Sequence, residues 1–391
     1  MFRKGIIALS AAAGLVGGLL VTGPVTAIGD GGGYAERHEG RDGDGGGRTE
    51  NLVFVQTNKP LGNTVQVYRR AADGVLTAAG EYETGGLGGA TVGPPVDALA
   101  SQGSLVYHDG LLFAVNAGSN TVTVFRVKGD ELVKLDVVGS GGLLPVGVGV
   151  HDDLVYVLNA GGDGVVQGYE LDDDGLELIE EARRSLGLGN ANPPAFGDAP
   201  AQVSVDPSGR FVLVSTKSHN TVEVFPIDHD GALGDPVSNT VDGTPFGFTF
   251  DREDGVVVTQ SGTNAVIRFE LDQDGKLVPT SPSVPSGQAA TCWIQRVGDF
   301  FFAANAGSST ISSYRLDPDG QLELLAGAAA APGGGSIDLT ASDGFLYVQL
   351  AAAGSVHGYE VGEDGSLRLV TTVTGLPQFA DGIGMEGIAA T

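Results

Sequence analysis

Six side chains that could do acid-base chemistry or bind a ligand lie at one aligned position of a repeated strand motif, or at the residue just before it. They comprise two carboxylates, two amides and two aromatic rings, namely Asp338, Glu386, Gln102, Gln202, Trp293 and Phe246. Carboxylates can donate or accept protons, and amides and an indole can orient an oxygen-rich ligand. We therefore predict Asp338 and Glu386 as catalytic residues, and Gln102, Gln202, Phe246 and Trp293 as substrate-binding residues. A second interpretation stays open, in which these polar groups satisfy one another and a column of channel waters.

A repeated pair of short strands around a turn would position these groups. The stretch at residues 111–127, LLFAVNAGSNTVTVFRV, has six counterparts, whose aligned turn positions are Asn63, Asn120, Asp163, Asn220, Asn264, Ser309 and Gly354. These positions are 43 to 57 residues apart. A period near 40 to 50 residues with four strand signals per unit is typical of a propeller blade. Seven copies therefore predict an all-β fold, a seven-bladed β-propeller over residues 51–391.

The order of strands predicts how the ring closes. The first copy begins without an innermost strand, while residues 386–390 match the innermost strands of later copies, such as residues 146–150. The C-terminal strand should therefore complete the first blade and remove the exposed sheet edges. Two longer gaps arise from insertions at residues 81–101 and 182–199. Both insertions lie in connections to an innermost strand, so we expect both at one mouth of the central channel.

The N-terminal region predicts export. Arg3 and Lys4 precede an uncharged run at residues 5–22, and small residues end at Ala27, which is the pattern of a signal peptide over residues 1–27. An uncleaved membrane anchor is the alternative. Residues 28–50 are rich in Gly, Asp and other charged residues and nearly free of apolar ones, so we expect a flexible linker there. The predicted location is outside the cell, with retention on the cell surface as an alternative.

Composition narrows the range of partners. The net charge of −27 becomes −29 once residues 1–27 are removed, because Arg3 and Lys4 leave with them. Nucleic acid and anionic membrane surfaces would repel such a chain. We expect a monomer with a small-molecule ligand in the central channel. The single cysteine, Cys292, rules out an internal disulfide and is expected to be a buried apolar residue.

The sequence gives little support to a metal site. Acidic residues from Glu170 to Glu181 fit the spacing of a calcium loop, but their DxDG core also recurs at residues 272–275 as a hairpin turn. No helices are predicted on either side of it. The six histidines include no pair at helical metal-ligand spacing. We therefore expect neither a metal nor an organic cofactor.

Several motifs together resemble a known family. The stretches NAGSNTVTVFRV, DPSGRFVLVSTKSHNTVEVFPID, TPFGFTFD and FFAANAGSSTISSYRLDPDGQLELL are similar to those of the lactonase-type seven-bladed propellers. That family includes bacterial 6-phosphogluconolactonase and fungal 3-carboxymuconate cyclase. The resemblance covers residues 51–391. It implies a small-molecule site in the central channel, where a lactone ring is hydrolysed or closed without a metal or organic cofactor.

This sequence differs from the family at the inner-strand positions that bind the anionic group of the substrate. Family members carry Pro-His and Pro-Arg-His motifs and an Asn-Glu pair on their inner strands. The corresponding stretches here resemble residues 200–202, 245–247 and 260–261, which read PAQ, PFG and QS. Without the arginine, a cationic clamp for phosphate or carboxylate is missing. A phosphorylated sugar lactone is therefore a poor substrate hypothesis.

The sequence leaves three functions open. The leading hypothesis is a secreted lactonase-like hydrolase, in which a carboxylate activates water to attack a neutral or weakly polar lactone. The alternative is a non-catalytic extracellular propeller whose two insertions grip a glycan, a polymer or a protein. A structural role in the cell envelope is a third possibility. Whether the chain is an enzyme is left open by the sequence.

Overall fold

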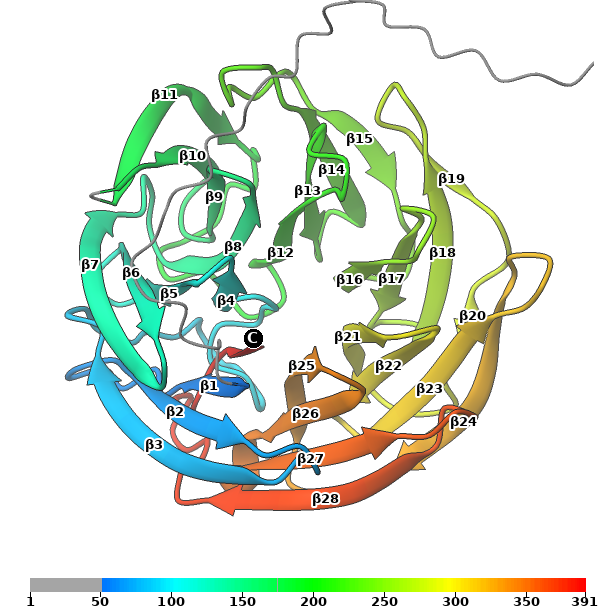
Figure 1. Cartoon of the computed structure of the whole chain (residues 1–391). Coiled ribbons are helices and arrows are strands. Elements are labelled where there is room, and N and C mark those ends of the chain that lie inside the picture. The colour runs from blue at the N-terminus through cyan, green and yellow to red at the C-terminus, as the bar shows by residue number, and fades with distance from the viewer. Residues whose placement is uncertain (1–50, 174) are drawn as a thin grey trace, which may run out of the picture. The chain divides into compact units, whose positions relative to one another are not determined.

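The computed structural model describes residues 51–173 and 175–391, which form seven antiparallel sheets around a central axis (Figure 1). The prediction of an all-β, seven-bladed propeller is therefore confirmed. The predicted signal peptide and linker lie outside the described residues and remain predictions. Within the described part of the chain, no helix has the length and apolar character needed to cross a membrane.

Six blades contain four strands and blade five contains five, in sequence order from the axis outward, except that the first blade takes its innermost strand from the end of the chain. Blade one contains β29 (Ile388–Ala390), β1 (Leu52–Gln56), β2 (Thr64–Arg70) and β3 (Leu76–Glu83). Blade two contains β4 (Leu105–His108), β5 (Leu111–Asn116), β6 (Thr121–Lys128) and β7 (Glu131–Gly139). Blade three contains β8 (Pro145–His151), β9 (Leu154–Asn159), β10 (Val165–Leu171) and β11 (Leu176–Ser185).

The remaining four blades follow the same scheme. Blade four contains β12 (Pro200–Val205), β13 (Phe211–Thr216), β14 (Thr221–Pro226) and β15 (Val237–Thr240). Blade five contains β16 (Pro245–Phe250), β17 (Val256–Gln260), β18 (Ala265–Leu271) and the short β19 (Leu277–Pro279) and β20 (Val284–Pro285). Blade six contains β21 (Thr291–Val297), β22 (Phe300–Asn305), β23 (Thr310–Leu316) and β24 (Leu322–Ala330). Blade seven contains β25 (Ser336–Ser342), β26 (Phe345–Leu350), the 3₁₀ turn η1 (Ala351–Ala353), β27 (Ser355–Val361) and β28 (Leu367–Thr374).

Local sequence explains where the strands turn. The repeated turn positions Asn120, Asn220 and Asn264 have φ angles of 55°, 54° and 56°. This left-handed conformation is strained for most side chains but tolerated by Asn and Gly. Strands β5 and β9 are buried over nearly their whole length, because each second strand packs against blades on both sides. The recurring Asn at these turns and the continuous apolar runs of the second strands therefore both follow from the blade structure.

The last strand closes the ring as predicted. Strand β29 pairs antiparallel with β1, with Val53 opposite Ala390 and Val55 opposite Ile388. Beyond the strand, the Glu386 N–H donates to the Gln56 carbonyl at 3.0 Å. In Figure 1 the C-terminus lies beside β29 at the centre of the ring.

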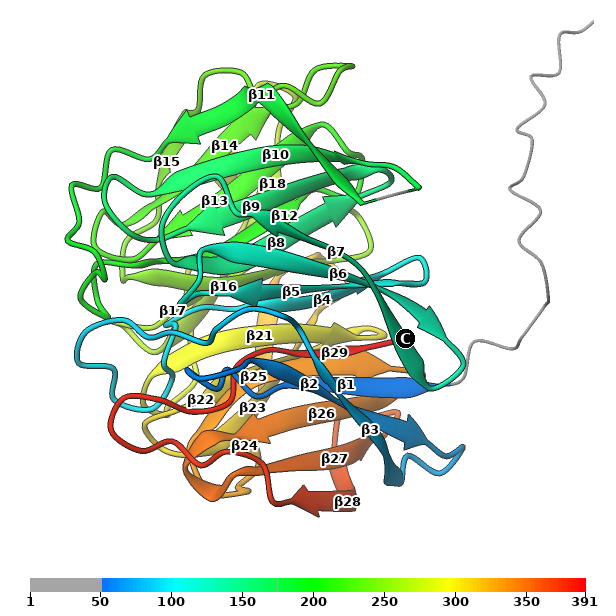
Figure 2. The same ribbon diagram turned by 90° about the vertical axis from the view of Figure 1, so that its left-hand side faces the viewer.

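The two insertions meet on one face, where they fill the channel instead of framing an open mouth. Val92 of the first forms a parallel bridge with Ala195 of the second. The first then continues across the axis, and its residues 97–101 are all buried. In the side view the cyan loop after β3 reaches the left-hand edge, opposite the end where β29 carries the C-terminus (Figure 2). Both insertions therefore lie on one face, as expected, and residues 97–101 of the first occupy the channel there.

Deleting residues 385–391 should destabilise the propeller strongly. The deletion exposes the inner edge of β1 and removes the buried side chains of Met385, Ile388 and Ala389. Truncating one large buried apolar side chain costs about 2–5 kcal/mol, against a typical total stability of about 5–15 kcal/mol. We expect aggregation or a melting temperature lower by more than 10 °C, roughly the effect of a loss of several kcal/mol. Leu369→Ala, on an exposed outer strand, is the control, and an unchanged melting temperature for the deletion would contradict a closed ring.

Candidate functional site

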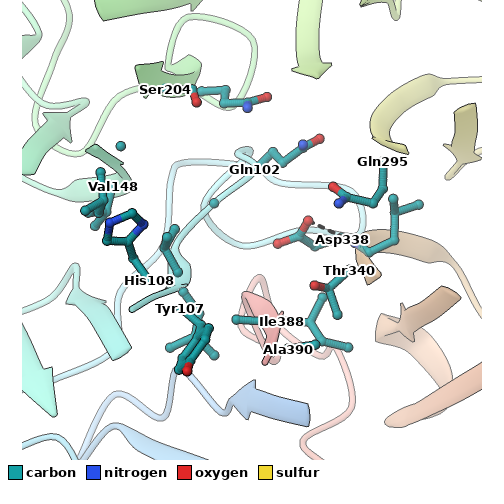
Figure 3. Close-up of a pocket in the computed structure, with 18 of the residues that line it drawn as sticks. Gln102, Tyr107, His108, Val148, Ser204, Gln295, Asp338, Thr340, Ile388 and Ala390 are labelled. Atoms are coloured by element: carbon teal, nitrogen blue, oxygen red, sulfur yellow. Dashed lines mark hydrogen bonds between the residues drawn. The ribbon is translucent and has the colours of Figure 1, made fainter. Parts of the chain in front are cut away.

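A cavity of about 360 Å³ opens among the innermost strands on the face opposite the insertions. Its lining includes polar side chains from four blades, namely Gln102, His108, Gln202, Ser204, Gln295, Asp338 and Thr340. In Figure 3 the Asp338 carboxylate lies among the side chains of Gln102, Gln295 and Thr340. The size is suited to a small molecule. Asp338 is the one carboxylate among the lining residues, which include no Lys or Arg.

Asp338 is held at the wall of this cavity by backbone donors. It lies on β25, and only 4% of its surface is exposed. The Leu339 N–H donates to its Oδ1 at 2.9 Å, and the N–H groups of Gly103 and Ile388 also bond to the carboxyl. Burial raises the pKa of Asp338 to about 7, and the negative charge of Asp97 adds to this effect. A carboxyl group with a pKa near neutrality can act as a general acid or base.

The two predicted amides line the cavity but are already engaged. Gln102 accepts from Ile294 N–H and donates to Ile294 C=O, both at 3.0 Å. Gln202 does the same with Phe248, at 2.7 and 3.0 Å. Each amide therefore satisfies the free backbone edge of another innermost strand, across the channel for Gln102 and in the adjacent blade for Gln202. A ligand would have to displace these bonds before either amide could bind it.

The predicted aromatic residues lie outside the cavity lining. Trp293 and Phe246 are each 1% exposed, and their ring centroids are 4.9 Å apart in an edge-on arrangement. Trp293 Nε1 donates to the Ser101 carbonyl at 2.8 Å. At Gly247, a Cβ would come within 2.3 Å of Gln102 Oε1, so only glycine fits where Gln102 crosses the channel. Trp293 and Gly247 therefore support residues 97–103, which we call the hub segment.

Glu386 also lies away from the cavity, in a buried pair with Asp97. Glu386 Oε1 accepts from Leu99 N–H at 3.0 Å, and the two carboxyl groups share a hydrogen bond. Burial raises the pKa of Glu386 well above its usual range, and the charge of Asp97 raises it further. Asp97 also has a raised pKa because of burial. Two like charges at such short range disfavour double ionisation, so the pair holds a proton.

The hub segment is tied to blades around the ring. Asp97 accepts from Leu99 N–H and Ser101 N–H at 3.1 and 3.0 Å, which fixes the turn. The Lys217 ammonium donates to the Ala100 carbonyl at 2.7 Å. Ala100 itself has a φ of 62°, an unusual conformation for a non-glycine residue. The sequence analysis selected neither Asp97 nor Lys217, although each is a charged residue at the edge of an apolar stretch.

Polar cavity residues that were not predicted from the sequence include His108, Ser204, Gln295 and Thr340. Gln295 lies on the innermost strand β21 and Thr340 on the innermost strand β25, each two residues beyond the predicted position. Neither side chain makes a hydrogen bond to another described residue of the protein, so both are available to a ligand. Their alternation with Trp293 and Asp338, two positions earlier, is the signal that could have identified them.

The residues of the calcium-loop alternative form a hairpin turn in the structure. Asp172 Oδ1 accepts from Gly175 N–H at 2.8 Å. Asp272 and Asp317 make the equivalent turn contacts, each accepting from backbone N–H groups two and four residues later. Among residues 51–173 and 175–391, no three acidic, His or Cys side chains are grouped to hold a metal ion. The recurring aspartates thus use their oxygens to stabilise the turns between the third and fourth strands of their blades.

Comparisons with known proteins agree with the architecture. Residues 184–294 match the family described as lactonase, 7-bladed beta-propeller. An 85-residue segment is 33% identical to 6-phosphogluconolactonase of Bacillus subtilis, and it spans 22% of this chain and 22% of that relative. The resemblance to the lactonase-type propellers is therefore confirmed.

Solved structures share the fold over most of their length. A putative 6-phosphogluconolactonase from Bacteroides fragilis is 14% identical, with a TM-score of 0.64 over 83% of this chain and 98% of that one. The periplasmic gluconolactonase of Pseudomonas aeruginosa is 17% identical, with a TM-score of 0.65 over 84% and 98%. At this identity the likeness concerns the fold.

Asp338→Asn should stabilise the protein at high pH. The folded-state pKa of about 7 lies above the ordinary value of 3.8, so the folded protein binds the proton more tightly than the unfolded chain does. Wild-type stability should therefore fall as pH rises from about 4 to about 7. The asparagine removes this penalty, which is worth roughly 4 kcal/mol at most above pH 7. Urea unfolding at pH 4 and pH 8 measures the difference. The exposed Asp109→Asn is the control, and equal effects of both variants at pH 8 would contradict the assignment.

Proposed function

We propose that this lactonase-like propeller hydrolyses a small uncharged lactone in the cavity around Asp338. The observation that carries the proposal is a buried carboxylate at the cavity wall, with a pKa of about 7 and unengaged donors beside it. Ionised Asp338 would take a proton from water as that water attacks the ring carbonyl. The Gln295 amide and the Thr340 hydroxyl would donate hydrogen bonds to the developing oxyanion. Glu386 has no direct part in this mechanism, because it lies outside the cavity.

Charge favours an uncharged substrate. The B. subtilis relative is named for a phosphorylated lactone. No Lys or Arg lines this cavity, while Asp338 is anionic once it acts as a base. A phosphate or carboxylate in the cavity would be repelled and left without a partner. We therefore propose neutral sugar lactones or simple aliphatic lactones as the substrate class, without a metal or organic cofactor.

The proposed setting follows from the sequence. The signal-like residues 1–27 support action outside the cell, and the net charge of −27 supports a monomer that avoids nucleic acid and anionic membranes. A fractionation experiment with the full-length chain would test the location.

Non-catalytic ligand binding is the second candidate. The observation that favours it is the complete engagement of the Gln102 and Gln202 amides with neighbouring backbone, which leaves few groups for catalysis. In that case the cavity would hold a small neutral molecule without changing it. Binding without turnover, equal in wild type and Asp338→Asn, would support this candidate.

Asp338→Asn should lower kcat/KM by at least about 100-fold on any lactone that the wild type opens, because general base catalysis is worth about 10²- to 10⁴-fold. A pH-stat assay over a panel of neutral lactones measures the rates. Wild-type kcat/KM should rise with pH through about 7, as Asp338 loses its proton. Asp109→Asn removes a carboxylate from the same face and should retain full activity. Inactivity of the wild type on every lactone, or equal rates in Asp338→Asn, would overturn the proposal.

A further inference from the structure

Lys217 lies on the other side of the hub segment from the cavity and takes no part in the proposed hydrolysis. It follows β13, and 3% of its surface is exposed. Its Nζ lies 4.9 Å from the Phe196 ring centroid and 5.0 Å from that of Phe246. Its hydrogen bond goes to a neutral group, the Ala100 carbonyl. Among the described residues, no carboxylate oxygen lies within the 4.0 Å of a salt bridge to Nζ.

A buried ammonium without a paired carboxylate is costly, so the neutral amine is favoured. Burial lowers the pKa of Lys217 to about 7, although the charges of Asp97 and Asp198 oppose the shift. A desolvated lysine of this kind is a nucleophile at neutral pH, unlike an ordinary surface lysine.

The two aromatic rings beside Lys217 Nζ differ in their exposure to solvent. Phe246 is buried, whereas Phe196 is partly exposed and comes from the second insertion. Phe196 therefore covers the side of the amine that lies nearest the surface. An approaching molecule would pass the Phe196 ring and the exposed carboxylate of Asp198, and a negative charge there disfavours anions. A small uncharged carbonyl compound fits these conditions.

We propose that Lys217 is a carbonyl-binding amine on the insertion face, covered by Phe196 and separate from the Asp338 cavity. The neutral Nζ would attack the carbonyl carbon of a small aldehyde or ketone and form a C–N bond. A proton moves from nitrogen to oxygen to give a carbinolamine, which loses water and leaves an imine. The proton shared by Asp97 and Glu386 can be donated to the carbinolamine hydroxyl, which then leaves as water. No electrons are transferred, and water is the only other product.

Reductive trapping of the full chain with acetaldehyde and cyanoborohydride at pH 6.5 tests this site. An ordinary lysine with a pKa near 10.4 is about a thousandfold less neutral than Lys217 at this pH. Peptide mass spectrometry should show Lys217 ethylated at least tenfold faster than Lys59, Lys128, Lys134 or Lys276. Its rate should level off above pH 7, whereas theirs should continue to rise. Cyanoborohydride supplies the hydride that reduces the trapped imine.

Two variants test whether the Phe196 ring limits access to the Lys217 amine. Phe196→Ala should speed ethylation of Lys217 at least tenfold, and Leu188→Ala, a matched truncation in the same insertion, should leave it unchanged. Circular dichroism and Trp293 fluorescence confirm that each variant is folded. Protection of Lys217 in folded wild type while the four other lysines react would overturn the proposal, as would equal rates in wild type and Phe196→Ala. Both results are independent of lactone hydrolysis, so this proposal and the proposed function can fail separately.

Discussion

The anchoring of the hub segment across the channel is the interaction on which the rest of the structure depends. A closed ring of seven sheets leaves polar backbone edges facing the axis, and these need partners. Residues 97–103 supply them: Gln102 bonds both backbone groups of Ile294, and Ser101 Oγ donates to the Val146 carbonyl. Blades that are remote in sequence are thereby joined through one short loop.

This loop carries an unusual electrostatic arrangement. Asp97 and Glu386 share a proton, and Lys217 bonds a neutral carbonyl instead of a carboxylate. A buried ion pair would gain Coulomb energy only after both charges were desolvated. Keeping the proton within the carboxyl pair and favouring the neutral amine avoids much of that cost. The same negative neighbour, Asp97, contributes to the raised pKa of Asp338 on the cavity side. The two sides of the hub are therefore coupled through one carboxylate.

The hub segment also explains the residues at positions 246 and 247. A Cβ at Gly247 would lie 2.3 Å from Gln102 Oε1 and 2.8 Å from the Cys292 carbonyl oxygen, so a side chain does not fit there. Phe246 packs on Trp293 and on the Lys217 amine. The central region is thus organised around the hub segment rather than around a cationic substrate clamp. The concavity that remains lies at the opposite end of the channel and is lined without Lys or Arg.

Sequence alone determined the blades, their number and the closure by the last strand. Those features follow from local periodicity, turn residues such as Asn120, and a count of strands that leaves the first copy one short. It also placed Asp338 and Gln102 correctly on the channel wall, because side chains alternate along a strand. It did not locate Asp97, Lys217 or Gln295, nor show that Glu386, Trp293 and Phe246 turn away from the cavity. Those outcomes depend on an irregular insertion that crosses the axis. The polar groups that this insertion satisfies are set by tertiary contacts between residues up to 287 positions apart in the sequence.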